Sequence, residues 1–319
     1  MLSTAGSPSA WLLCAPPDHP EPCPESGTTV SKPAAYLGIW RMWGASSDLG
    51  TSAYLLSIPV LSSVIEFEKV SVKARGRAII SGATFTVESR AFLLGPNGSG
   101  KTTLLRAASG VVPYEGSIRI FGAEVRRAKR LLGVSSNLPE IYQAVYRVGG
   151  IAEVWADLKG DFDPRLFEEL LRSFKLDPGE LSRKPIHALS AGESTLVRLA
   201  AALASRPRAY LVDEPFENVD PARRRLVAEA LRSFGEVGLV ATHDLGALRA
   251  LPEFDAYLLV EGRIYGPFAA GELLDLGLSE GVHGDAVAVL EIGGVKYSLR
   301  RGAGRRLGDM ATIDMIYSA

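Results

Sequence analysis

The chain contains one stretch whose residue types and spacing are those of a phosphate-binding loop. Residues 95–103 read GPNGSGKTT and fit the pattern G-x-x-x-x-G-K-[ST]. The three glycines allow positive φ angles and a close approach of the backbone to a ligand, so that N–H groups can hold phosphate oxygens. Lys101 can reach the outer phosphates, and the Thr102 hydroxyl can ligate Mg²⁺. The residues expected to contact phosphate are Gly95, Pro96, Asn97, Gly98, Ser99, Gly100, Lys101, Thr102 and Thr103.

Two adjacent carboxylates, Asp213 and Glu214, end a second apolar run at residues 210–212. At the end of a strand beside the phosphate loop, Asp213 can hold Mg²⁺ through its water shell. Glu214 points in another direction and can orient or deprotonate an attacking water. An acidic turn after a buried strand is common, so the pair indicates catalysis only in combination with the loop.

The run LSAGE at residues 189–193 precedes an apolar helical stretch at 196–204. Ser190 and Glu193 have the spacing of a capping box, in which each side chain bonds to the other residue's N–H group. The capping box explains the spacing but leaves Gly192 unexplained, because glycine weakens the first turn of a helix. Close approach of the backbone to a ligand would account for Gly192.

These three motifs, in this order, make the chain resemble the ATP-binding cassette (ABC) family over about residues 64–276. The segment at 216–220 lies where the family has its D-loop, and His243 lies where it has its switch histidine. The resemblance implies an ATPase that binds ATP and Mg²⁺, with Glu214, His243 and Lys101 as its catalytic residues. Metal contacts would come from Thr102 and Asp213.

The resemblance also implies a head-to-tail dimer with two ATP sites between the subunits. Each site would take the phosphate loop, both carboxylates and His243 from one chain, and Ser190, Ala191 and Gly192 from the other. Asp220, in the D-loop, is a further expected nucleotide contact. The partner ATPase could be an identical or a related subunit, and the helical segment at 149–189 would dock onto transmembrane permease subunits.

The chain departs from the family pattern at three places. Asn137 stands near the position of the family's Q-loop glutamine, and its shorter side chain is expected to contact Mg²⁺ and nucleotide less well. The family's adenine-stacking aromatic is missing between residues 70 and 78, where Arg75 or Arg77 could stack instead. Ala191 replaces a glycine of the signature.

The elements that position these residues are predicted by short apolar runs. Runs at 64–70, 83–87, 91–94, 117–121 and 131–134 indicate strands, and runs at 209–212, 238–241 and 256–260 are typical of buried parallel strands. Helical spacing covers 102–108 and 149–176. Residues 287–292 and 295–299 predict a hairpin around Gly293-Gly294. The predicted fold is α/β: a P-loop NTPase of ABC type with a mixed sheet core, an antiparallel β subdomain, a helical subdomain and a small β-rich C-terminal extension.

We expect three parts: an N-terminal extension at 1–62, an ATPase domain at 63–276 with its helical subdomain at about 138–190, and the C-terminal extension at 277–319. The proline-rich composition of the first part suits an unordered tail or an over-extended start. Cys14 and Cys23 both lie there, so the chain has no pattern of a disulfide scaffold.

The net charge of −1 gives no reason to expect nucleic-acid binding. No run has the roughly 20 apolar residues that cross a bilayer, so a span would come from another chain. We therefore expect an ATPase subunit that energises transport, located in the cytoplasm at the inner face of the cell membrane. Two alternatives remain open: a soluble ABC ATPase outside transport, and a nucleotide-gated interaction module with low turnover.

Overall fold

The computed structural model describes residues 64–74, 76–128, 133–142, 145–159 and 162–318. The predicted N-terminal extension, its two cysteines and Arg75 lie outside these residues. Contacts group residues 60–319 into one compact unit.

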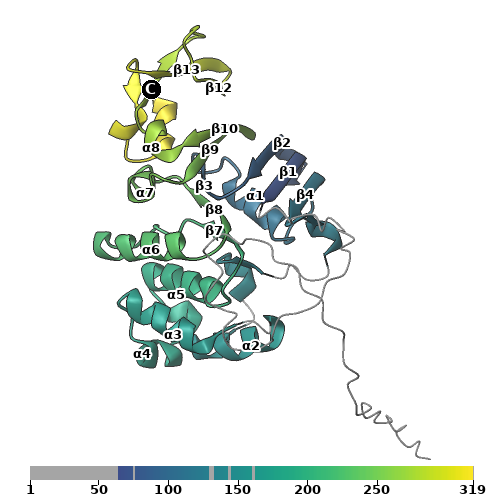
Figure 1. Cartoon of the computed structure of the whole chain (residues 1–319), viewed down its shortest axis with the longest axis vertical. Coiled ribbons are helices and arrows are strands. Elements are labelled where there is room, and N and C mark those ends of the chain that lie inside the picture. Colours follow the sequence, from purple (N-terminus) through teal and green to yellow (C-terminus); the bar gives the residue numbers. More distant parts are fainter. Residues whose placement is uncertain (1–63, 75, 129–132, 143–144, 160–161, 319) are drawn as a thin grey trace, which may run out of the picture. The chain divides into compact units, whose positions relative to one another are not determined.

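A six-stranded sheet forms the centre of this unit, in the order β10-β9-β3-β8-β7-β6 (Figure 1). Neighbouring strands from β9 to β6 run parallel, and β10 pairs antiparallel at the edge. The strands are β3 (Arg90–Leu94), β6 (Val134–Ser136), β7 (Ala209–Asp213), β8 (Val237–Thr242), β9 (Asp255–Val260) and β10 (Arg263–Ala269). The predicted buried parallel strands are confirmed.

The central sheet is covered on both faces, as the continuous apolar runs of its strands require. Alternate side chains of β3 enter two different hydrophobic clusters: Phe92 and Leu94 lie in one, Ala91 and Leu93 in the other. Successive residues of a strand point to opposite faces, so β3 belongs to both cores at once. This central strand leads directly into the phosphate loop.

An antiparallel sheet of order β2-β1-β4-β5 lies on one side of the core. Its strands are β1 (Ile65–Ala74), β2 (Arg77–Val87), β4 (Glu115–Ile120) and β5 (Ala123–Glu124). Helix α1 (Lys101–Ala108) buries Leu104 and Leu105 in a cluster shared with Ile118 of β4 and Leu93 of β3. The helix that follows the phosphate loop is therefore packed against both sheets.

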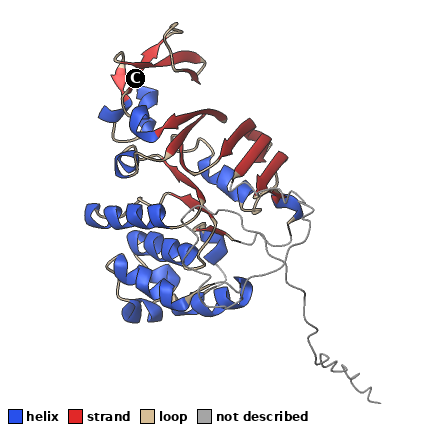
Figure 2. Ribbon diagram, in the orientation of Figure 1, coloured by secondary structure: helices blue, strands red, loops and turns tan. Residues whose placement is uncertain are grey.

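Four helices, α2 (Gly149–Lys159), α3 (Pro164–Ser173), α4 (Pro178–Arg183) and α5 (Ala191–Leu203), gather away from the antiparallel sheet (Figure 2). The single helical stretch predicted at 149–176 is divided between α2 and α3. Asp163 caps α3, because its side chain accepts hydrogen bonds from Arg165 N and Leu166 N, and Pro164 opens the helix. Helices α6 (Pro221–Ser233), α7 (Gly246–Ala250) and α8 (Ala270–Leu273) follow later strands.

The C-terminal region forms a third sheet of order β12-β13-β11-β14. Its strands are β11 (Leu276–Glu280), β12 (Ala288–Ile292), β13 (Val295–Arg301) and β14 (Arg305–Arg306). The predicted hairpin is confirmed: Ile292 pairs with Val295, and Gly293 and Gly294 both have positive φ (59° and 80°). The sheet packs onto the main core through Leu290 and Leu299.

Candidate active site

The phosphate loop connects β3 to α1, as the motif predicts. Gly98 and Gly100 have φ of 80° and 104°, which disfavours any side chain there. Gly95 is required for a different reason, because a Cβ on it would lie 2.4 Å from Leu259 O. Close packing against β9, and not a positive φ, therefore explains the first glycine of the motif.

Lys101 lies beneath the loop, with only 6% of its side chain exposed. Its Nζ donates hydrogen bonds to Gly95 O at 2.7 Å and Pro96 O at 3.2 Å. Glu214 Oε1 lies 3.5 Å from the same nitrogen. The ammonium thus stands at the beginning of the loop, paired with the carboxylate that follows β7.

Asp213 and Thr102 meet at the other side of the loop, where Thr102 Oγ1 donates to Asp213 Oδ2 at 2.8 Å. Burial raises the pKa of Asp213, and Thr102 opposes the shift. The second oxygen, Oδ1, is buried and accepts no hydrogen bond from any described residue. A buried carboxylate oxygen without a partner, next to a hydroxyl, offers the hard oxygen donors that suit Mg²⁺.

Glu214 has a backbone φ of 43°, a conformation that costs energy for a residue with a side chain. Its carboxylate accepts hydrogen bonds from Thr242 Oγ1 at 2.9 Å and pairs with His243 Nδ1 at 2.8 Å. The strained turn therefore aims Glu214 at the end of β8, where His243 begins the next loop. Glu214 and His243, which belong to different motifs 29 positions apart, are therefore in direct contact.

The structure places Asn137 differently from our expectation of a metal contact. Its Oδ1 accepts from Asp213 N at 2.7 Å, and its Nδ2 donates to Asp213 O at 2.9 Å. The residue is fully buried. Both polar atoms of the amide are thus engaged with the main chain of Asp213 in this conformation.

Ser190 and Glu193 form the predicted capping box at the start of α5, with Ser190 N bonded to Glu193 Oε2 at 2.9 Å. A Cβ on Gly192 would lie 2.5 Å from Asn218 O, in the loop that follows Asp213 and Glu214. Packing within one chain therefore supplies a reason for Gly192 that the sequence did not reveal. Asp220 caps α6 by accepting from Arg223 N at 3.1 Å.

A hollow of about 470 Å³ lies over the phosphate loop. Ser190, Ala191 and Gly192 are not among its described lining residues, whereas Thr195 and Arg198 of the same helix are. Arg77 is not among them either. The lining comprises Ala74, Ile79, Asn97, Gly98, Gly100, Lys101, Thr102, Thr103, Arg106, Pro139, Thr195, Arg198, Asp213, Glu214 and Glu217.

Three residues of the site were missed by sequence reasoning. Arg198 lines the hollow and donates to Asn137 O at 3.1 Å, and burial lowers the pKa of its guanidinium. Thr242 holds Glu214, and its place directly before His243 could have indicated this contact. Asp314 accepts a hydrogen bond from Asn97 N at 2.7 Å. The two residues are 217 positions apart in sequence, so no local pattern predicts this contact.

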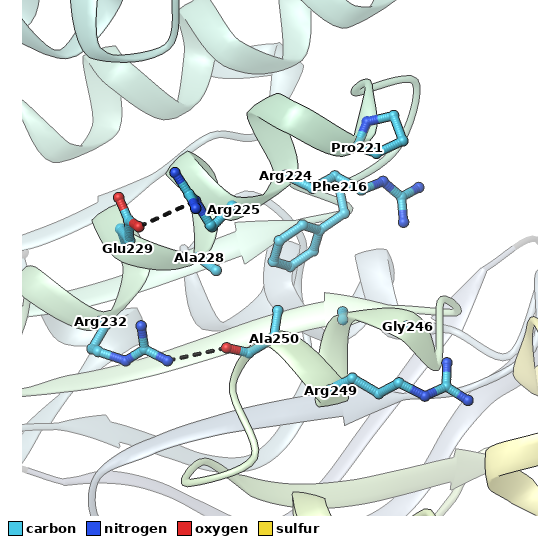
Figure 3. Close-up of a pocket in the computed structure, with 11 residues that line it drawn as sticks. Phe216, Pro221, Arg224, Arg225, Ala228, Glu229, Arg232, Gly246, Arg249 and Ala250 are labelled. Carbon is cyan, nitrogen blue, oxygen red and sulfur yellow. Dashed lines mark hydrogen bonds and ion pairs between the residues drawn. The ribbon is translucent and has the colours of Figure 1, made fainter.

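A second hollow, of about 460 Å³, lies between α6 and α7 and is lined by several arginines (Figure 3). Arg225 faces Glu229, and Arg232 donates to Ala250 O. Arg224 pairs with Asp244. Arg232 also pairs with Glu253, so these three arginines each have a carboxylate partner, while Arg249 donates to the neutral carbonyl of Gly308.

Comparison with known proteins identifies the class. The family described as ABC transporter matches residues 81–217. A solved structure whose description names cobalt transport and cbiO-2 is 40% identical, with a TM-score of 0.74, and covers 80% of this chain and 99% of that one. Another, described as the ATP binding subunit of an ABC transporter, is 20% identical with a TM-score of 0.55, covers 66% of this chain and 91% of that one, and supports the fold alone.

Curated relatives agree. The hemin import ATP-binding protein HmuV of Rhizobium leguminosarum is 32% identical over 66% of this chain and 87% of its own length. The manganese transport system ATP-binding protein MntB of Halalkalibacterium halodurans is 30% identical over 56% and 74%. The iron(III) import ATP-binding protein FbpC of Streptomyces coelicolor is 34% identical over 63% of this chain, which spans 61% of that relative.

The chain belongs to the ABC transporter family, as one of its ATP-binding subunits. ATP hydrolysis is the activity of this class, so the predicted fold, nucleotide and ATPase function are confirmed, and the transport role is favoured over the two alternatives. No helix in the described part of the chain is long and apolar enough to cross a membrane.

Proposed function

We propose that this chain hydrolyses ATP as one half of a dimer that drives a membrane transporter, with permease subunits supplied by other chains. The observation that supports the dimer most is that Ser190, Ala191 and Gly192 do not line the hollow over the phosphate loop of their own chain. Ser190 and Ala191 are exposed at the start of α5, where a second subunit could present its own loop to them. The position expected for such a subunit is the cytoplasmic face of the membrane.

Glu214 would position or deprotonate the water that attacks the γ-phosphate in line. Its contacts with Thr242 and His243 fix the carboxylate, and His243 would also contact the γ-phosphate. Lys101 would leave its carbonyl partners and stabilise the charge that develops on the phosphate oxygens. Thr102 and Asp213 would hold Mg²⁺, which neutralises phosphate charge when it is bound.

Asn137 would act on this site through the main chain of Asp213. Its two hydrogen bonds fix the end of β7, and therefore the direction in which both carboxylates leave the strand. We retain it as a residue that positions the metal-binding carboxylate.

The cargo is not specified by these residues. The relatives' names refer to iron(III) import, manganese transport and hemin import, so the class uses one kind of ATPase subunit with different cargoes. Cargo specificity would lie in the permease.

The substitution Glu214→Gln tests the catalytic assignment. The variant should bind ATP as the natural protein does, because the amide preserves shape and removes only the proton-accepting charge. Turnover should fall about 10²- to 10⁴-fold, the usual contribution of a positioned acid or base. Steady-state ATPase activity close to that of the natural protein would rule out Glu214 as the catalytic base. The proposed permease partner is tested separately, by co-purification of the chain with a multi-span membrane protein.

A further inference from the structure

The C-terminal extension reaches the nucleotide site through residues 311–318. A hollow of about 340 Å³ beside the active site is lined on one side by Glu214 and His243 and on the other by Ala311 and Thr312. Ile313 N donates to His243 O at 2.9 Å, and Thr312 forms a bridge with Asp244. The last turn of the described chain is therefore attached to the loop that carries the switch histidine.

Apolar anchors hold this segment in place. Met310, Ile313 and Ile316 are each no more than 2% exposed and belong to the main hydrophobic cluster. Burial of such side chains stabilises the packed state by about 1.5–3 kcal/mol each. The backbone of 310–316 is thus fixed on the core, while the side chain of Asp314 extends from it toward the phosphate loop.

Asp314 Oδ1 accepts the hydrogen bond of Asn97 N, a main-chain donor of the phosphate loop, at 2.7 Å. Charge-assisted bonds from backbone N–H groups to an anion are the interaction by which such loops hold phosphate. The carboxylate of Asp314 therefore accepts a hydrogen bond that a phosphate oxygen would otherwise accept.

The donor lies at the outer-phosphate end of the loop. Lys101 Nζ bonds to Pro96 O, the carbonyl of the peptide whose nitrogen is Asn97 N. The lysine of this motif reaches the β- and γ-phosphates. A negative charge held beside that peptide would repel the γ-phosphate more than the inner ones.

We propose that Asp314 is an internal competitor of the γ-phosphate: it satisfies the phosphate loop in the nucleotide-free chain and must swing away when ATP binds. Rotation of one side chain is enough, because the anchors of 310–316 lie on other residues. The inference rests on the proposed nucleotide site and adds a residue of the C-terminal extension to it. Asp314 would thereby raise the ATP concentration that is needed to fill the nucleotide site.

The test compares Asp314→Asn and Asp314→Ala with the natural protein. Asp309→Asn is the matched control, since it removes an exposed carboxylate of the same extension whose described contacts do not include the phosphate loop. Calorimetric titration with Mg²⁺ and a non-hydrolysable ATP analogue should give a Kd about five- to tenfold lower in both Asp314 variants, the size of one typical net hydrogen bond at an exposed site. The Kd for ADP should change much less, and Asp309→Asn should match the natural protein.

Steady-state ATPase kinetics distinguish competition between Asp314 and the γ-phosphate from a structural role of Asp314 in the His243 loop. If Asp314 competes with phosphate, the KM for ATP falls in both variants and kcat changes little. Unchanged or weaker binding of the analogue, or a fall in kcat at constant KM, would overturn the proposal and make Asp314 a support of the His243 loop. If the natural protein binds neither nucleotide, the proposed function fails and not this inference alone.

Discussion

Asp213 and Glu214 are neighbours in sequence, yet their side chains serve different partners because the backbone turns between them. Asp213 ends β7 with extended geometry and faces Thr102, whereas the positive φ of Glu214 directs its carboxylate toward Thr242 and His243. The cost of that conformation, about 1–3 kcal/mol, persists where the surrounding structure determines it. The hydrogen bond of Glu214 N to Ala241 O at 2.8 Å supplies part of that support.

Asn137 was predicted as a metal contact, and in the structure its amide bonds to the main chain of Asp213. Replacement by alanine should leave the buried N–H and C=O of Asp213 without partners and destabilise the fold by about 2–4 kcal/mol. Urea unfolding without nucleotide or Mg²⁺ measures this loss. Asn97→Ala, at an exposed position, is the control and should stay within about 0.5 kcal/mol.

A metal-ligand role for Asn137 makes the opposite prediction. In that case Asn137→Ala would unfold like the natural protein in metal-free buffer and would lose only Mg²⁺-dependent affinity for ATP. Stability unchanged in the absence of Mg²⁺ would therefore contradict the positioning role.

At the scale of elements, α5 and the loop at 216–220 are packed too closely for a side chain at residue 192. Gly192→Ala would push Cβ against Asn218 O, and two backbone segments would have to separate. We expect a loss of about 1–3 kcal/mol in the nucleotide-free protein, as for other overpacked sites. Thermal or urea unfolding tests this, with the exposed Ala191→Ser as the matched control. If Gly192→Ala kept full stability but lost ATPase activity, Gly192 would be required only for contact with the ligand.

The sequence predicted β3, β7, β8 and β9 because a strand buried on both faces is apolar throughout, as at residues 209–212. It did not predict the edge strand β10, and its run at 131–134 overlaps β6 only at Val134. It predicted the phosphate loop and the capping box because their geometry depends on residues close together in the chain. It missed the division between α2 and α3, although Asp163-Pro164 is a start signal. Contacts such as Asn137 with Asp213 and Asp314 with Asn97 join distant segments, and only the packed fold determines them.

At the scale of the whole molecule, the two groups of residues proposed to contact nucleotide lie on different elements of the same chain. The phosphate loop and both carboxylates end the strands of the central sheet, while Ser190 and Ala191 begin a helix of the helical group. A second copy, placed head to tail, would unite each loop with the partner's signature. Closed twofold symmetry is the commonest way for such complementary surfaces to assemble.

The mass of the Glu214→Gln variant in solution tests this account most directly, because ATP bound without turnover should hold the two copies together. The chain has a mass of 34.1 kDa. Light scattering should give about twice that mass with Mg²⁺ and ATP and the single mass with ADP, as expected for a ligand that binds the dimer more tightly than the single chain. Ser190→Arg, in the same background, should prevent the doubling. A variant that binds ATP and keeps the single mass at all concentrations would contradict a composite site formed by two copies of this chain.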